Sequence, residues 1–170
     1  MSLFFPGTKF KIFLEDLMSE KPTTADAELI LKMYDLRREP EMRKARNWLL
    51  TQFWPNGADD VVKLASGLGT QENAWMRQVT GYWELMASMA DRGVVNQEMF
   101  LEPSFSGEMF FMFAKIRSFL PELREKLQAP TMFRHVESLI KSSKSAQDFL
   151  AATEVRVANR KKAMAEAAKA

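Results

Sequence analysis

Cysteine is absent from the 170 residues, and histidine occurs once, at His135. Without cysteine the protein has no disulfide, thiolate metal site, iron–sulfur cluster or thiol nucleophile. A lone histidine gives little support to a transition-metal site or to a histidine-based catalytic triad. The lack of cysteine suits a reducing compartment, so we expect a cytoplasmic protein. Because the usual metal-binding side chains are scarce, we also expect no metal and no cofactor.

Long apolar runs and strand patterns are also missing. No stretch approaches the roughly 18 apolar residues that cross a bilayer, and residues 1–6 lack the charged start and cleavage site of a secretory signal. No segment shows the alternation of a β-strand, and no internal repeat is present. Lys and Arg exceed Asp and Glu by only 24 to 22. We therefore expect no transmembrane segment, no sheet and no strong electrostatic attraction to nucleic acid.

Apolar residues, by contrast, make up 46% of the chain, and they recur at intervals of three and four residues. This spacing is typical of amphipathic helices. The longest patterned segment follows the capping residue Thr70 and carries a broad apolar face that includes Trp75, Met76, Val79, Trp83 and Met86. The sequence predicts an all-α fold, an irregular bundle of six to eight helices with a buried central helix near 70–92.

Capping residues and prolines predict the other helix boundaries. Residues that favour N-caps precede further apolar stretches at Thr23 or Thr24, at Asn96, at Ser104 or Ser106, and at Ser143 or Ser145. Prolines indicate a break near Glu39, a bend at Pro121 and a helix that starts at Pro130. A first amphipathic helix is expected over residues 10–18. The apolar side chains of residues 104–120 nearly encircle their helix, so we expect it to be largely buried.

The chain has the length of one domain. After Asn159 it consists of Ala, Lys, Arg and Glu with Met164 as the only large apolar side chain. We predict a single helical domain over residues 1–158 and a polar tail over residues 159–170 that frays or extends a helix into solvent.

Candidate catalytic residues are few. His135 lies at the border of an apolar stripe, which favours a boundary residue over a catalyst. The adjacent carboxylates Asp59-Asp60 point in different directions around a helix, so they are expected to cap or charge its surface. The glycines of residues 66–70 lack the G-x-G-x-x-G spacing and fit a turn between helices. We assign no catalytic residue and no metal ligand, and the sequence favours a protein that is not an enzyme while leaving enzymatic activity open.

The densest basic region, residues 37–46, contains five Arg or Lys residues interleaved with Asp35, Glu39 and Glu41. A solvated helix face with ion pairs explains it, so nucleic-acid binding is a weak alternative. The N-terminal Leu3-Phe4-Phe5 is apolar and must pack on its own core, on a second subunit or at a membrane surface. We favour its own core or a dimer.

Two parts of the chain carry recognisable short motifs. The first is Leu31–Arg37 followed by Glu39–Arg46, which contains Pro40-Glu41-Met42-Arg43-Lys44-Ala45-Arg46, and the second is Tyr82–Met86 followed by Arg92–Val95, which contains Tyr82-Trp83-Glu84-Leu85 and Arg92-Gly93. Together they resemble a bacterial helical family known only as a domain of unknown function. The resemblance covers roughly residues 25–140, and this chain has Tyr82-Trp83 where the family motif has two Phe. It implies no established reaction, cofactor or ligand.

The resemblance draws attention to Glu84 on the central helix. A buried carboxylate is costly unless an arginine meets it, and Arg43 or Arg46 is the expected partner. Such a cluster would either fix the packing of two helices, which we favour, or hold a polar ligand in a cleft. The leading hypothesis is thus a non-enzymatic protein-interaction or regulatory module that self-associates or binds another protein. The alternative is a small-ligand-binding or hydrolytic protein that uses an Arg/Glu cleft.

Overall fold

A computed structural model describes residues 21–169, which form nine α-helices and one 3-10 helix and contain no strand. In chain order they are α2 (Thr24–Leu36), α3 (Pro40–Thr51), α4 (Ala58–Ser66), α5 (Gln71–Asp91), α6 (Gln97–Leu101), α7 (Pro103–Ala114), η1 (Arg117–Phe119), α8 (Leu120–Lys126), α9 (Arg134–Ser142) and α10 (Lys144–Ala167). The all-α prediction is confirmed. The expected helix over residues 10–18 and Leu3-Phe4-Phe5 lie outside the described residues.

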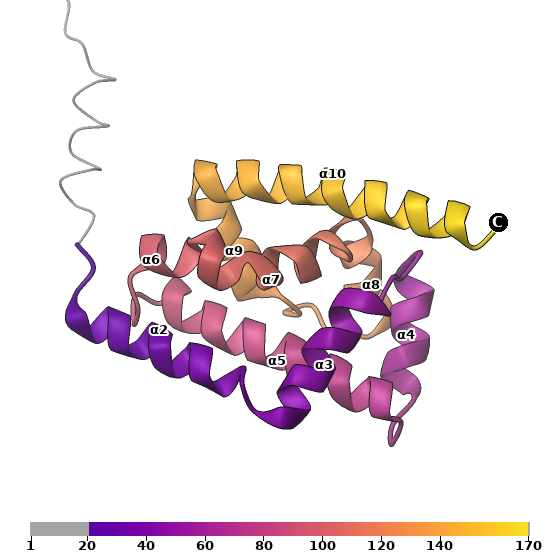
Figure 1. The fold of residues 1–170 in the computed structure, drawn as a ribbon, viewed down its shortest axis with the longest axis horizontal. Helices are drawn as coiled ribbons and strands as arrows, with labels where there is room; N and C mark the ends of the chain where they lie inside the picture. Colours follow the sequence, from indigo (N-terminus) through magenta and orange to yellow (C-terminus); the bar gives the residue numbers. More distant parts are fainter. Residues whose placement is uncertain (1–20, 170) are drawn as a thin grey trace, which may run out of the picture.

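Helix α5 is the centre of the bundle, as predicted. It packs against α3 on one flank and α9 on another, while α10 lies across α7 and α9. In the view of Figure 1, α10 runs along one side of the molecule and α2 and α3 run along the opposite side. Eight residues of α5 are buried, and Trp83 at its middle is fully enclosed. One continuous apolar core therefore connects the helices.

The predicted N-caps are confirmed at four helices. The side chains of Thr23, Thr70, Asn96 and Ser143 accept hydrogen bonds from the backbone N–H groups of Asp26, Asn73, Met99 and Ala146. Each satisfies a donor that has no partner within its own helix. The break near Glu39 is confirmed as well, because the Glu39 carboxylate caps α3.

Two predicted helix starts are wrong. Helix α7 begins at Pro103 and not at Ser104 or Ser106, since the fixed φ of proline suits the first helical position. Helix α9 begins at Arg134 and not at Pro130, which lies in a turn that leads to Phe133 in the left-handed conformation, with φ 55°. The apolar helix is also shorter than the predicted 104–120, because α7 ends at Ala114 and a 3-10 helix follows over Arg117–Phe119. The predicted burial is confirmed for α7, in which six residues are buried: Phe105, Ser106, Met109, Phe110, Met112 and Phe113.

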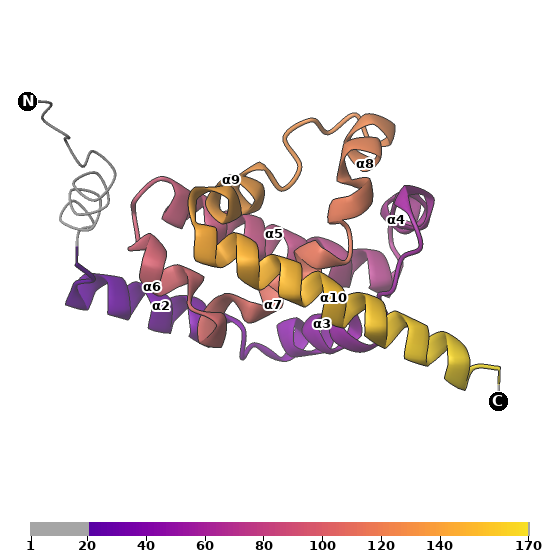
Figure 2. The same ribbon diagram turned by 90° about the horizontal axis from the view of Figure 1, so that it is seen from above.

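Helix α10 continues without interruption to Ala167, beyond the residue at which we placed the domain boundary. After Val157 nearly all its side chains are exposed, and its end extends past the neighbouring helices (Figure 2). Lys161 is the exception, because its Nζ donates to the Pro55 carbonyl at 2.6 Å. No helix of the described part is both long and apolar enough to cross a membrane.

Candidate functional site

The predicted ion pair between Glu84 and Arg43 or Arg46 does not form. Arg46 donates from Nε to both oxygens of Glu108 on α7, at 3.0 and 2.8 Å, and not to Glu84. Arg43 is exposed, and no ion pair joins it to any carboxylate of residues 21–169. Arg43, Arg46 and Glu84 therefore do not come together. The reason is rotation along α5: Trp83 faces Glu108, so Glu84, one residue further, faces another neighbour.

Glu108 is the centre of a buried polar cluster. Its side chain is only 6% exposed. Besides the bonds from Arg46, the carboxylate accepts a hydrogen bond from Trp83 Nε1 at 3.2 Å, and it lies 3.7 Å from Nη2 of Arg37. Arg37 also donates to the Phe105 carbonyl at 2.9 Å and stacks over the Trp83 ring. Burial lowers the pKa of Arg37, although the charge of Glu108 opposes the shift. One carboxylate thus joins α3, α5 and α7 to the C-cap residue of α2.

This cluster changes the interpretation of residues 37–46. Arg37 is buried, Arg46 is paired with Glu108, and Lys44 is paired with Glu41 at 2.6 Å. Arg38 contacts Asp35 at 3.9 Å. Most of the basic side chains of this region are thus engaged within the described fold, which leaves a small positive surface.

Glu84 instead caps helix α9 from across the bundle. Its two carboxylate oxygens accept the backbone N–H groups of His135 and Val136 at 3.0 and 3.3 Å. These are the second and third residues of α9, whose own N-cap residue, Phe133, provides no side-chain acceptor. A carboxylate at this position also interacts favourably with the helix dipole. Glu84 thereby fixes the start of α9 on α5.

His135 is held by its neighbours. Its Nδ1 lies 2.7 Å from Oδ2 of Asp91, and Arg134 donates from Nε to its Nε2 at 3.1 Å. Because Nε2 is an acceptor, the ring proton resides on Nδ1, which donates to Asp91. The hydrogen bond from His135 is the main reason why the pKa of Asp91 is lowered. The imidazole lies at the edge of an open cavity of about 390 Å³, and both of its ring nitrogens already have hydrogen-bond partners.

Lys115 is a buried cation that sequence reasoning missed. Its Nζ donates to the carbonyls of Leu49 and Phe53, at 2.6 and 2.7 Å, and lies 3.7 Å from the centre of the Trp54 ring. No carboxylate of the described residues pairs with it. Burial lowers the pKa of Lys115 to about 7. A single lysine among the apolar residues 109–116 was the available signal, since such an exception requires a polar partner inside the fold.

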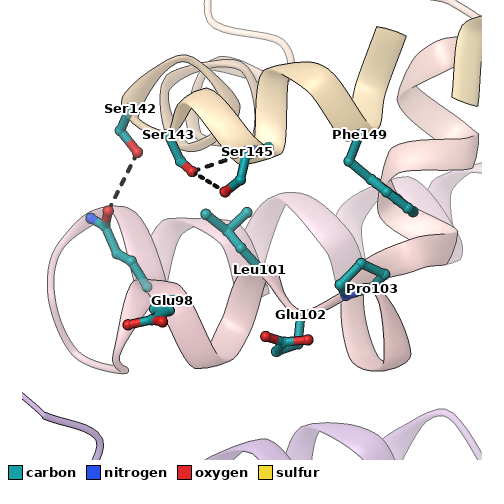
Figure 3. A pocket seen from close by; sticks show the side chains of 10 residues that line it. Glu98, Leu101, Glu102, Pro103, Ser142, Ser143, Ser145 and Phe149 are labelled. Atoms are coloured by element: carbon teal, nitrogen blue, oxygen red, sulfur yellow. Dashed lines mark hydrogen bonds between the residues drawn. The ribbon is translucent and has the colours of Figure 1, made fainter. Parts of the chain in front are cut away.

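A cavity of about 530 Å³ lies between the α6–α7 junction and the start of α10. Figure 3 shows the side chains that line it. Leu101 and Phe149 line it, and serine hydroxyls lie on one side, away from the carboxylates of Glu98 and Glu102. The hydroxyls are occupied: Ser143 bonds to Ser145 at 2.8 Å, and Ser142 donates to the Leu139 carbonyl. The acidic and hydroxyl groups do not converge on one point. Residues 21–169 also contain no group of three His, Asp or Glu side chains placed to bind a metal ion.

Comparison with known protein families adds one result. The model of the domain of unknown function DUF4760 matches residues 22–143. The chain belongs to this family. The match begins just before α2 and ends at the N-cap of α10, so the DUF4760 region comprises the central helix and its flanking helices but not α10. No curated protein and no solved structure matches the chain.

Proposed function

We propose that this DUF4760 protein is a non-enzymatic interaction module that self-associates through the outer face of α2. The observation that carries the proposal is a pair of exposed apolar side chains one helical turn apart. Leu31 is 68% exposed and Tyr34 is 50% exposed, whereas Ile30 and Met33 on the inner face are buried. Contiguous exposed apolar surface marks interaction sites, and tyrosine is enriched in the cores of protein interfaces.

Helix α2 is firmly attached, which is what a recognition surface requires. Tyr82 donates from its hydroxyl to the Met33 carbonyl at 2.7 Å, and the Asn96 N–H donates to Asp26 at 2.7 Å. The outer face of α2 lies along the edge of the bundle, and no other described helix runs over it (Figures 1 and 2). A rigid surface loses little conformational entropy when a partner binds.

The charges beside Leu31 and Tyr34 support a second copy as the partner. Glu28 lies at one end of this face and Arg38 follows its other end, and both are exposed. An interface with two-fold symmetry brings the same surface of two copies together in opposite directions. Antiparallel pairing of two α2 helices would therefore place each Glu28 near the Arg38 of the other copy.

Less supports the alternative of an Arg/Glu cleft that binds a ligand or performs hydrolysis. Arg46 and Glu108 already satisfy each other, and Glu84 already accepts two backbone N–H groups. A ligand at either place would have to displace these bonds. Binding of nucleic acid by residues 37–46 faces the same obstacle, because Arg37 is buried.

Size-exclusion chromatography with light scattering tests the proposal. The wild-type mass should rise from one chain toward two as the concentration increases, and Leu31→Glu should keep the protein at one chain because a carboxylate is costly in an apolar interface. Leu68→Glu is the matched control, since Leu68 is 76% exposed in the turn between α4 and α5, far from α2. It should associate like the wild type. A wild-type protein that stays at one chain, or a Leu31→Glu variant that still associates, would refute the proposal.

A further inference from the structure

A cavity of about 480 Å³ lies between the end of α3, the α3–α4 loop and the start of α5. Its walls are mainly aromatic and apolar, from Trp48, Phe53, Trp54 and Leu64. We call it the aromatic pocket. Its size is within the range of small-molecule sites in proteins, and such sites combine apolar walls with a few polar groups at the edge. It lies at a distance from α2 and plays no part in the association proposed above.

The loop that carries Trp54 is fixed by two lysines from other helices. Lys115, the C-cap residue of α7, binds the Phe53 carbonyl at 2.7 Å, and Lys161 on α10 binds the Pro55 carbonyl at 2.6 Å. These bonds satisfy loop carbonyls that have no place in a regular helix ladder. The loop is thereby connected to the second half of the chain at both sides of Trp54.

The Trp54 ring itself is held in one orientation. Its Nε1 donates to the Thr51 carbonyl at 3.1 Å, Lys115 Nζ lies 3.7 Å from the ring centre, and Phe111 meets it edge-on at 5.8 Å. Trp48 is likewise packed against Phe53, with ring centres 5.2 Å apart. The aromatic wall is therefore formed before any ligand arrives, which reduces the entropy lost on binding.

The edge of the aromatic pocket is acidic. Asp60, Lys63 and Glu72 line it, so two carboxylates face one ammonium, and none of the three makes an ion pair within the described residues. Asp60 accepts hydrogen bonds from Asn56 through one oxygen. The carboxylates remain open to a cationic group at the mouth of the pocket. Aromatic walls also favour flat rings and cations.

We propose that the aromatic pocket binds a flat aromatic molecule that carries an ammonium group. The ring packs against the tryptophan wall, and the ammonium lies at the edge, where Glu72 and Asp60 attract it. The walls supply most of the binding free energy, and the acidic edge supplies the selectivity for charge.

Four tryptophans make the test specific, because each indole N–H gives one peak in a 15N-correlated NMR spectrum. Tryptamine is the probe. It should shift the peaks of Trp48 and Trp54 in a saturable manner and leave Trp83, which is enclosed in the core, unchanged. Indole-3-acetate has the same ring with a carboxylate in place of the ammonium, and it should bind more weakly.

A pair of variants tests the acidic edge. Glu72→Gln should weaken tryptamine about two- to fivefold, the range expected for one exposed charge pair, and should narrow its advantage over indole-3-acetate. Glu98→Gln, a matched change at an exposed site on α6, should change neither affinity. An unmoved Trp83 peak shows that each variant is folded. The proposal is overturned if tryptamine leaves Trp48 and Trp54 unshifted, if indole-3-acetate binds equally well, or if Glu72→Gln behaves like Glu98→Gln.

Discussion

At the scale of single residues, the buried charges of this protein are bound by groups from distant parts of the chain. Glu108 receives donors from α3 and α5, and Lys115 binds carbonyls 62 and 66 residues away. The sequence predicted that Arg43 or Arg46 would pair with Glu84, but Arg46 pairs with Glu108 and Glu84 accepts backbone N–H groups of α9. Periodicity alone places both Glu84 and Glu108 on helices, and it gives no relative rotation of α5 and α7 with respect to α3. The partner of Arg46 could therefore not be chosen from the sequence.

Removal of the central carboxylate, Glu108, should strongly destabilise the fold. Glu108→Ala leaves the guanidinium groups of Arg37 and Arg46 without their anion in a buried place, and we expect a loss of about 3–5 kcal/mol in the free energy of unfolding. The comparison is Glu154→Ala, which breaks the more exposed pair with Arg117 and should cost less than about 1 kcal/mol. Urea denaturation measures both. Equal effects of the two substitutions would show that Glu108 is not a structural centre.

Lys115 should make stability depend on pH. Its pKa is about 7 in the fold and 10.5 as the ordinary value, so between these pH values the unfolded chain binds more protons than the folded protein. The free energy of unfolding should therefore rise by at most a few kcal/mol as the pH increases from 7 toward 10, and this gain is lost when the pH is lowered back to 7.

The test compares urea denaturation at pH 7 and pH 9 in the wild type and in Lys115→Met. The variant loses the bonds to Leu49 and Phe53, so it should be less stable at both pH values, but the rise with pH should be smaller. The same rise in both proteins would exclude Lys115 as its source.

At the scale of helices, the sequence predicted the start of a helix correctly where the N-cap residue is adjacent to that helix in the chain. Thr23, Thr70, Asn96 and Ser143 each bind an N–H within three residues, and the sequence identified them. The start of α9 was missed because its acceptor, Glu84, is 51 residues distant from His135. Phe133 also adopts the left-handed conformation, which ends the preceding turn. The proline at position 130 gives no sign of this conformation.

The cap supplied by Glu84 can be tested by amide hydrogen exchange. Glu84→Ala should accelerate exchange at His135 and Val136, and it should cost about 0.5–2 kcal/mol in stability, as for other lost N-caps. Ser143→Ala provides a control, because it removes the local cap of α10 and should accelerate exchange at Ala146 instead. Unchanged exchange at His135 and Val136 in Glu84→Ala would contradict the assigned role.

At the scale of the whole molecule, composition and spacing were enough for the fold class and for the central helix, because both follow from which residues must be buried. The surface was harder. Exposure of Leu31 and Tyr34 depends on which elements cover α2, and the spacing of apolar residues does not give this. The pocket beside Trp54 likewise depends on how the α3–α4 loop packs, which the spacing of apolar residues does not give.

Helix α10 lies outside the DUF4760 match, yet its apolar side chains complete the core. Phe149 meets Phe110 edge-on at 4.9 Å, and Leu150 and Val157 are buried. A chain that ends at Ser143 should therefore lose cooperative unfolding, because α7 and α9 would expose apolar surface. A chain that ends at Ala158 loses mainly the Lys161 bond and should remain within about 1 kcal/mol of the full chain. Cooperative thermal unfolding of the shorter chain would contradict this view.

The central claim, self-association through α2, is tested most directly by backbone amide chemical shifts of the wild-type protein recorded over a dilution series. Concentration-dependent shifts should be concentrated at Leu31, Tyr34 and their neighbours on α2, with the ends of α10 and α4 unaffected. Spectra that do not change with concentration, or shifts centred on another surface, would contradict the claim.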